Sequence, residues 1–294
     1  MSVTLPPPLA PATPARRRRR LNGSVVVGGV LVGAVVAAAL VSYVWTPHEP
    51  GRLTPSDRLS KVLENGHVLG ADNLGRDVLT ELMVGARLTL YVGVVAVAIA
   101  AVIGIPLGAL AAVRGGWLSE LIMRASDVVL AFPAVLLAIM LAATVKDPGS
   151  RTFTAMVAIG VGSVPAFARL TRAEALRVLA SEYVLAARAA GRDRFAIVIR
   201  HVLPNVSAAL IVQASVLFAI AILAEAALSY LGIGAGPDVT SWGRMLDDSQ
   251  TYVRQRLTLA VFPGLAIALA VLGFNLLGDG LRDTLDPTLR RRGR

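Results

Sequence analysis

The sequence predicts an all-α, polytopic membrane protein with six transmembrane helices, and composition, apolar patterning and charge placement support this fold class. Hydrophobic residues make up 55% of the 294 residues and charged residues 16%, against roughly 45–50% and 25% in soluble domains. Six apolar stretches alternate with polar segments, and none of the six contains Lys or Arg. An ordinary soluble protein is therefore excluded. The absence of Cys excludes a disulfide framework and a thiol nucleophile.

The six predicted spans are rich in Val, Ala, Leu and Ile, with a length that suits the crossing of a bilayer by an α-helix. They are Ser24–Trp45, Leu88–Val113, Val128–Val145, Thr152–Ala168, Val206–Leu231 and Leu257–Leu277. Pro106, Pro133 and Pro165 lie within spans, which membrane helices tolerate when neighbouring helices satisfy the freed backbone groups. Gly104 and Gly108 have the spacing that lets helices approach closely, although ordinary span composition is the preferred explanation.

The N-terminal segment, residues 1–23, is rich in Pro and Arg and is expected to be a disordered cytoplasmic tail. The five arginines of Arg16–Arg20 precede the first span, as basic residues do in a secretory signal. However, the apolar run at 24–45 is longer than the usual signal core of roughly 7–15 residues. We therefore expect an uncleaved signal anchor that forms the first transmembrane helix.

Charge placement predicts that both termini are cytoplasmic. With the N-terminus inside, the four cytoplasmic segments hold 19 of the 29 Lys and Arg residues and the three outer segments hold 10, a positive-inside asymmetry. The net charge of +10 then reflects topology and contact with lipid headgroups, and not nucleic acid. The remaining predicted segments are an extracytoplasmic loop at 46–85, a transmembrane domain at 86–279, its cytoplasmic loop at 169–205, its extracytoplasmic loop at 232–256 and a basic cytoplasmic tail at 280–294.

Signatures of catalysis and of proton coupling are missing from the sequence. A phosphate-binding P-loop needs a Lys after Gly, but the two lysines, Lys61 and Lys146, follow Ser and Val. The three histidines are too dispersed for a zinc motif of the HExxH type, so no metal site is expected. Apart from Glu225, the spans lack the acidic residues that a proton-coupled carrier uses. Uphill transport would therefore need energy from a partner.

The cytoplasmic loop contains a pattern typical of a short helix with exposed small residues. Ser181 can cap its N-terminus, with Glu182 favourably placed in the first turn. An apolar stripe at helical spacing runs through Tyr183, Ala186, Ala187 and Ala190. Gly191 suits the left-handed position after the helix, and Asp193 can cap the next one. Such a helix docks in a groove of another protein. The alternative is an inward extension of the fourth span that packs on its own bundle.

The same loop resembles the "EAA" loop of bacterial ABC-importer permeases. The residues that match are Leu185-Ala186-Ala187, Gly191 and Leu203-Pro204, and their spacing agrees throughout. Two positions differ, because Leu185 replaces the Glu of the pattern and His201 replaces its Ile.

Other segments resemble the second ("C") permease subunit of the dipeptide/oligopeptide permease family. His67–Leu79, followed by Gly85-Ala86-Arg87, is similar to its periplasmic lead-in, with Val68 and Ala71 in place of the usual Pro and Thr. Further similar segments are Glu225–Gly232, Ser241–Leu246, Phe262–Gly264, Asn275–Asp283 and Leu285–Pro287. The similarity extends from about His67 to Arg290, roughly three quarters of the chain.

This resemblance implies a type I ABC-importer permease fold in the bacterial plasma (inner) membrane. A second, homologous permease, two ATPase subunits or domains and an extracytoplasmic substrate-binding protein are the implied partners. ATP and Mg would be bound by the ATPases, so this chain would be a non-catalytic subunit without a cofactor or metal of its own. The implied coupling residues are Glu182, Tyr183, Ala186, Ala187 and Gly191.

The resemblance also implies the substrate class, di- or oligopeptides, for which this chain would form half of the translocation path. Haem, a nickel chelate or glutathione are alternatives, because the family also handles these compounds. A stand-alone secondary carrier is disfavoured by the missing coupling residues, and an intramembrane enzyme by the missing nucleophile and metal ligands.

Three polar features of the outer side have competing interpretations. Glu225, near the outer end of its span, can line an outer gate or bind a peptide amine. A structural role, anchoring the outer loop through Arg244 or a backbone N–H, is slightly preferred. Trp242 can anchor the loop at the membrane interface or stack on the substrate, and the interfacial anchor is preferred. Arg76 and Asp77 are expected to open an amphipathic surface helix.

Overall fold

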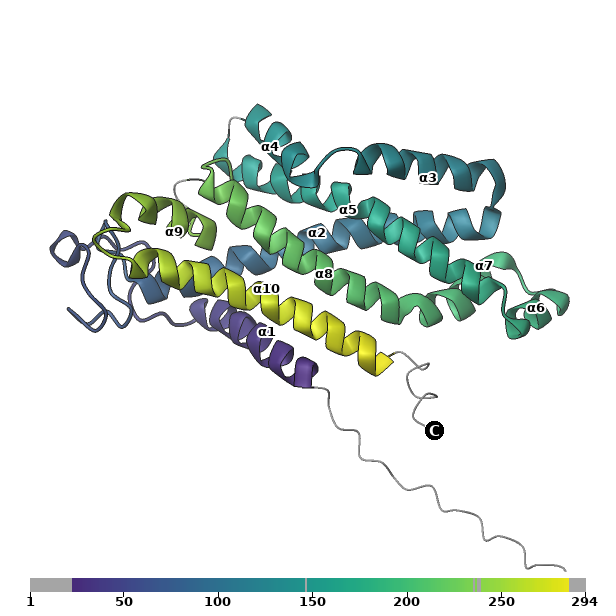
Figure 1. Ribbon diagram of the computed structural model, residues 1–294, viewed down its shortest axis with the longest axis horizontal. Helices are drawn as coiled ribbons and strands as arrows, with labels where there is room; N and C mark the ends of the chain where they lie inside the picture. The colour runs from purple at the N-terminus through teal and green to yellow at the C-terminus, as the bar shows by residue number, and fades with distance from the viewer. Residues whose placement is uncertain (1–22, 146, 235, 237–238, 286–294) are drawn as a thin grey trace, which may run out of the picture.

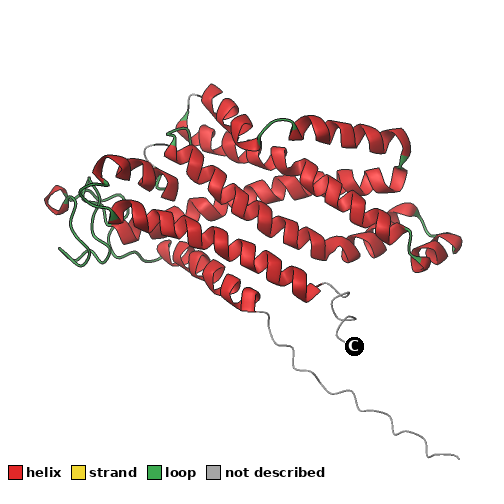
Figure 2. Cartoon of the chain, in the orientation of Figure 1, coloured by secondary structure: helices red, strands yellow, loops and turns green. Residues whose placement is uncertain are grey.

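The computed structural model describes residues 23–145, 147–234, 236 and 239–285 (Figure 1). Within this part of the chain the regular secondary structure is entirely helical, apart from two isolated β-bridges, which confirms the all-α class (Figure 2). Five helices are long and apolar enough to cross a membrane, and a bent pair of shorter helices brings the number to six. Of the predicted tails at 1–23 and 280–294, residues 1–22 and 286–294 lie outside the described residues, whereas residue 23 and residues 280–285 are helical.

Most elements follow one another along the chain with short connections, and the longest segment between two α-helices precedes α2. They are α1 (Gly23–Ser42), η1 (Pro55–Asp57), α2 (Val78–Arg114), α3 (Gly116–Leu130), α4 (Ala134–Thr144), α5 (Pro148–Leu179), α6 (Glu182–Ala189), α7 (Arg194–Ile197), the π-helical turn η2 (Val198–Val202), α8 (Leu203–Tyr230), α9 (Trp242–Ser249), η3 (Gln250–Tyr252) and α10 (Thr258–Leu285).

The helix α2 begins well before the predicted span at Leu88. Asp77 is its N-cap, and the carboxylate accepts a hydrogen bond of 2.8 Å from the backbone N–H of Thr80. Val78 in the first turn is buried. The separate surface helix expected after Arg76 is therefore wrong: the same residues form the first turns of one continuous helix, because their apolar face packs inside the protein.

The third predicted span is broken. Instead of one helix over 128–145, α3 ends at Leu130 and α4 begins at Ala134, with a bend of 75° between their axes. Pro133 occupies the N-cap position of α4. Proline disfavours helical geometry in the preceding residue and cannot donate to a carbonyl in the preceding turn, which accounts for the break. Pro106, Pro165 and Pro263, in contrast, lie inside continuous helices, as membrane helices tolerate.

The segment predicted as a cytoplasmic loop at 169–205 is mostly helical. α5 continues to Leu179, beyond the predicted end of the fourth span at Ala168. α7, η2 and α8 form one continuous rod from Arg194 to Tyr230. The wide turn η2 ends at Val202, just before Leu203-Pro204, and the missing N–H of Pro204 leaves a carbonyl of the preceding turn without its regular helical donor.

Close helix packing forms the core, and the small residues of α2 make it possible. α2 packs along α5, and α1 packs along α10 at the opposite side of α8 (Figure 1). A Cβ added at Gly104 would lie 2.6 Å from Cβ of Phe167. One added at Gly108 would overlap the backbone carbonyl of Ala168 and lie 2.7 Å from Cβ of Thr171. These glycines therefore allow α2 and α5 to approach each other closely. This role is more specific than ordinary span composition.

The two ends of the bundle carry different structures (Figure 1). The 46–77 segment and α9 cover one end, which we call the α9 end. The helices α6 and α7 project from the other, which we call the α6 end. The candidate functional residues therefore divide into two groups at opposite ends of the bundle.

Candidate functional site

The helix α6 is a short projection held by hydrogen bonds at its C-terminal end. Gly191 has a φ of +77° and donates its N–H to the carbonyl of Arg188 at 2.9 Å. The N–H of Arg192 bonds to the carbonyl of Ala187 at 3.1 Å. These two bonds form a Schellman motif, which requires a residue in the left-handed conformation at this position. The structure thus places Gly191 where the sequence pattern predicts it.

The N-terminal cap of α6 differs from the expectation. Ser181 occupies the N-cap position, but its hydroxyl donates to the carbonyl of Val178 at 2.5 Å and accepts nothing from α6. The expected capping bond of Ser181 is therefore absent, because the hydroxyl satisfies the last turn of α5 instead. Asp193 does cap α7, accepting a bond of 2.9 Å from the N–H of Phe195.

One side of α6 packs on the chain itself and the other is open. Val184 is fully buried, in a core cluster that also contains Leu179 and Val202. Tyr183 and Ala186 are exposed, whereas Ala187, expected on the open stripe, is half-buried. The sequence pattern does not single out Val184 as the inward residue, because its neighbours Tyr183 and Leu185 also have large apolar side chains. Both interpretations of this loop, an extension that packs on its own bundle and a helix that docks on another protein, therefore apply in part. The loop packs on the bundle through Val184, and the other side of α6 is exposed.

The open surface at the α6 end combines apolar side chains with charged side chains of both signs. The ring of Tyr183 contacts that of His201, with centroids 5.9 Å apart. Leu185 and Tyr183 are about half exposed, at 50% and 49%. Exposed charged residues of both signs surround them: Glu182, Arg188, Arg192 and Asp193. This mixture suits a polar-rimmed protein interface.

Glu225 lies inside the bundle toward the α9 end. Its side chain is buried, and Oε1 accepts a hydrogen bond of 2.7 Å from the hydroxyl of Ser229 one turn later. Ser241, which caps α9, lies near this carboxyl group, but Oε2 has no hydrogen-bond partner in the described part of the chain. The anchoring partner expected from sequence, Arg244, lies instead 3.9 Å from Asp248, measured from Nε to Oδ2. The carboxyl group is therefore held by a hydroxyl group of its own helix, α8, beside the start of α9.

We expect Glu225→Ala to lower the thermal midpoint of the purified transporter more than Glu225→Gln does. Glutamine keeps an oxygen that accepts from Ser229, whereas alanine leaves buried hydroxyls without an acceptor, at a cost of about 1–3 kcal/mol. The measurement is thermal unfolding together with uptake per folded transporter. Wild-type stability with altered uptake in both variants would assign Glu225 to the translocation path instead. Wild-type stability and uptake in both would contradict both roles.

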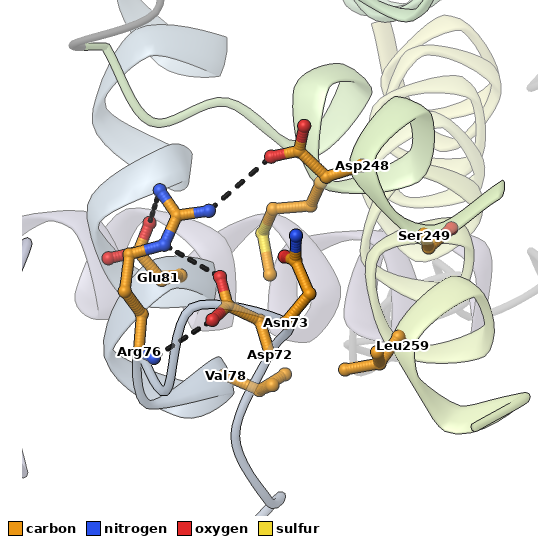
Figure 3. Close-up of a pocket in the computed structure, with 9 residues that line it drawn as sticks. Asp72, Asn73, Arg76, Val78, Glu81, Asp248, Ser249 and Leu259 are labelled. Carbon is orange, nitrogen blue, oxygen red and sulfur yellow. Dashed lines mark hydrogen bonds and ion pairs between the residues drawn. The ribbon is translucent and has the colours of Figure 1, made fainter. Parts of the chain in front are cut away.

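A salt-bridge network ties the start of α2 to α9 (Figure 3). Nε of Arg76 lies 2.6 Å from Oδ2 of Asp72, and Nη2 lies 3.3 Å from Oδ2 of Asp248. Glu81 approaches Nη1 at 3.8 Å and accepts a bond from Thr240. Burial opposes the charge of Arg76, but Asp72, Glu81 and Asp248 outweigh it and raise the pKa of the guanidinium. The sequence offered no signal that Glu81 and Asp248 would meet Arg76.

The tryptophan of α9 is part of the interior. Trp242 is buried, and its Nε1–H donates to the carbonyl of Leu82 at 2.9 Å. A Cβ added at Gly85 would lie 2.8 Å from Cδ1 of this indole ring. The expectation of an interfacial anchor is therefore wrong, because the missing side chain of Gly85 leaves a slot in α2 that the ring fills.

The family of the chain follows from its sequence match to a family model. The model of the "Binding-protein-dependent transport system inner membrane component" matches residues 104–291, which include α5 to α10 and the whole α6 end. The chain belongs to this family. It is therefore a multi-pass inner-membrane permease component of a binding-protein-dependent transport system.

Curated relatives of this permease align with 78% to 97% of its length. A dipeptide transport system permease protein, DppC, of Alkalihalophilus pseudofirmus is 38% identical over 97% of this chain and 94% of its own. A di/tripeptide transport system permease of Pseudomonas aeruginosa is 44% identical over 78% of this chain and 75% of its own. A glutathione transport system permease, GsiD, of Pectobacterium atrosepticum is 39% identical over 93% and 90%, respectively. These alignments confirm the predicted resemblance to the "C" permeases.

A solved structure shows the same fold. The chain matches a chain of the inward-facing MetNI methionine ABC transporter with a TM-score of 0.58 over 69% of this permease and 94% of that chain. The sequence identity is 21%, so this likeness shows the fold alone. It confirms the type I importer fold predicted for the permease.

Proposed function

We propose that this chain forms half of the translocation path of an ATP-driven importer for short peptides, which an extracytoplasmic binding protein delivers. The observation that carries this proposal is the alignment with a dipeptide transport permease over 97% of the chain. Because the alignment covers 97% of the chain, it includes nearly all residues at the α6 end and at the α9 end as well as the membrane-spanning helices.

The partners in this proposal are a second, homologous permease and two ATPase subunits or domains, which bind ATP and Mg. The coupling element is α6, with Glu182, Tyr183, Ala186, Ala187 and Gly191 as its coupling residues. Three features support this role: α6 projects from the bundle, its surface at Tyr183 and Leu185 is uncovered, and Gly191 closes it with a Schellman motif. A helix of eight residues is unstable alone in water, so packing and docking must hold it.

Glutathione is the second candidate substrate. A glutathione transport permease is 39% identical over 93% of this chain, and glutathione is itself a tripeptide derivative. The two candidates therefore share a charged amino terminus and a carboxylate, and the binding protein decides between them.

The experiment is uptake into vesicles that contain the complete transporter with its cognate binding protein. We expect ATP-dependent uptake of a radiolabelled dipeptide that excess unlabelled dipeptide abolishes and excess glutathione does not. The reverse competition pattern would assign glutathione, and uptake by this chain without an ATPase partner would contradict the importer proposal. Failure to co-purify with an ATPase and a second permease would also count against it.

The proposed orientation places the α6 end and both termini in the cytoplasm. It is supported by the 19 Lys and Arg residues of the inner segments against 10 in the outer segments. Reporter fusions truncated after Arg192 are expected to report a cytoplasmic position, and fusions after Gln250 an outer one. Fusions after Asp147 serve as a further outer site. The opposite result at Arg192 and Gln250 would overturn the orientation.

A further inference from the structure

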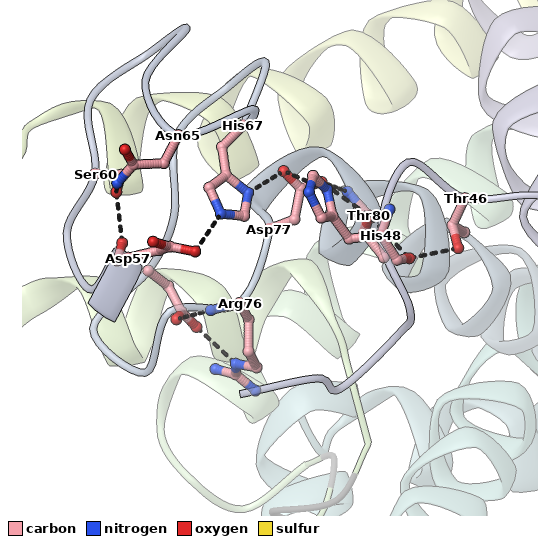
Figure 4. A network of polar contacts seen from close by, with 10 residues as sticks. Thr46, His48, Asp57, Ser60, Asn65, His67, Arg76, Asp77 and Thr80 are labelled. Atoms are coloured by element: carbon pink, nitrogen blue, oxygen red, sulfur yellow. Dashed lines mark hydrogen bonds and ion pairs between the residues drawn. The ribbon is translucent and has the colours of Figure 1, made fainter. Parts of the chain in front are cut away.

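Three metal-binding side chains meet at the start of α2, on the α9 end (Figure 4). Nδ1 of His67 lies 2.9 Å from Oδ1 of Asp77, and Nδ1 of His48 lies 3.5 Å from the same oxygen. The two imidazole rings stack with centroids 4.4 Å apart. One ligand atom from each residue lies within 4.8 Å of the other two.

These separations suit one tetrahedral metal ion. Zinc binds imidazole nitrogen and carboxylate oxygen at about 2.0–2.2 Å, which places neighbouring ligand atoms about 3.3 Å apart. The observed separations of 2.9 Å and 3.5 Å lie on either side of this value. We propose that His48, His67 and Asp77 bind a divalent transition-metal ion of the Zn²⁺ class. Water completes the fourth position, as in sites with three protein ligands.

The carboxylate is already oriented for this role. Oδ2 of Asp77 accepts hydrogen bonds of 2.8 Å from both the N–H and the hydroxyl of Thr80. Oδ1 is therefore the oxygen that faces the two histidines. The hydroxyl of Thr80 also accepts a bond of 3.1 Å from the backbone N–H of His48, which holds this residue beside the start of α2.

Asp57 supplies the outer contact that metal-binding histidines usually have. Its Oδ2 lies 3.6 Å from Nε2 of His67, the ring nitrogen on the side away from Asp77. A carboxylate in this position orients the imidazole and increases its basicity as a ligand. In the proposed site the metal ion is bound by Nδ1 of His67 and Oδ1 of Asp77 together, in place of the direct 2.9 Å contact between these two atoms.

His48 distinguishes the metal site from a simple helix cap. A cap at Asp77, oriented by His67, explains those two residues but not the third. Nδ1 of His48 is buried and has no hydrogen-bond partner in the described part of the chain. Buried polar atoms are nearly always paired, so this nitrogen points to a missing ligand. His67 and Asp77 are buried, whereas the side chain of His48 is 34% exposed and leaves a route for an ion.

The experiment measures zinc in the purified transporter, with this chain at full length and with an affinity tag that contains no histidine. We expect His48→Ala and His67→Ala each to contain about one Zn²⁺ per chain less than the wild type after dialysis. Loss of one ligand should weaken binding at least about tenfold, since even an outer-shell partner contributes this much. Added Zn²⁺ should also raise the thermal midpoint of the wild type, because an ion that binds the folded state stabilises it.

The third histidine of the chain is the matched control. His201 lies at the α6 end, beside Tyr183, so His201→Ala should retain the wild-type zinc content. Because His48 is partly exposed, His48→Ala should fold even if His67→Ala does not. Equal zinc content in the wild type and His48→Ala, with no zinc-dependent rise of the midpoint in either, would overturn the proposal.

Discussion

Replacement of Gly191 by Val is expected to reduce substrate-stimulated ATP hydrolysis and uptake together, by about fivefold or more. Gly191 has a φ of +77° and open space around its Cα, so the penalty comes from the backbone and not from a clash. A β-branched residue in this conformation is strained by about 1–3 kcal/mol, and about 1.4 kcal/mol corresponds to a factor of ten. The strain opposes the Schellman motif that closes α6 and so lowers the population of the docked helix.

Two further variants separate this effect from general damage. Gly191→Asn should retain most activity, because Asn tolerates the left-handed conformation far better than Val. Gly51→Val is the matched control, since Gly51 has a similar φ of +74° and equally open surroundings but lies in the segment at the α9 end. Gly51→Val should leave substrate-stimulated ATP hydrolysis and uptake near their wild-type levels.

The measurement is ATP hydrolysis by the reconstituted transporter, with and without loaded binding protein, alongside uptake. Membrane insertion and docking of the binding protein should be unchanged in Gly191→Val, because both depend on other parts of the chain. Full stimulation of ATP hydrolysis and full uptake in this variant would contradict the assignment of α6 as the coupling element. A bulky residue at the exposed Ala186 tests docking better than one at the half-buried Ala187.

The second large effect is expected for Gly108→Leu, which should abolish most of the folded transporter. A side chain at this position meets the backbone carbonyl of Ala168 and the Cβ of Thr171 on α5. Backbone atoms cannot rotate away, so α2 and α5 must separate along the most extensive helix contact in the bundle. Overpacking typically costs about 1–3 kcal/mol and occasionally more.

The control for this prediction is Gly29→Leu in α1, where an added Cβ has no described atom within 4 Å. Both variants introduce the same side chain into a membrane helix and change hydrophobicity equally. We expect a low yield and a thermal midpoint lower by roughly 5 °C or more for Gly108→Leu. A near-normal yield is expected for Gly29→Leu. Equal yields and midpoints would show that the α2–α5 contact does not depend on this glycine.

Local sequence patterns predict those parts of the fold that depend on local chemistry. Five of the six spans are recovered as continuous helices because a membrane requires each apolar segment to satisfy its own backbone hydrogen bonds. The cap at Asp193 and the positive φ of Gly191 are predicted for a similar reason, since each depends on neighbouring residues alone. The family resemblance extends these predictions to the type I fold.

Other features depend on residues that are distant in sequence, and periodicity carries no information about them. Pro133 ends a helix whereas Pro106 does not, although both lie in apolar runs. Trp242 is buried because Gly85 of another helix leaves space for its ring. The network of Arg76 with Asp248 likewise joins separate segments.

The sequence by itself determined the membrane class, five of the six spans, the family and the position of the short helix α6. The length of an apolar stretch, the charge of each segment and a local motif are properties of contiguous residues. They can therefore be recognised in the sequence without knowledge of the fold. Only the tertiary structure decided which side of α6 is open, that Glu225 is buried and bound by Ser229 and not by Arg244, and that His48 and His67 meet at Asp77. These outcomes depend on which surfaces of different helices pack together, and that is set by side-chain volume across the whole bundle.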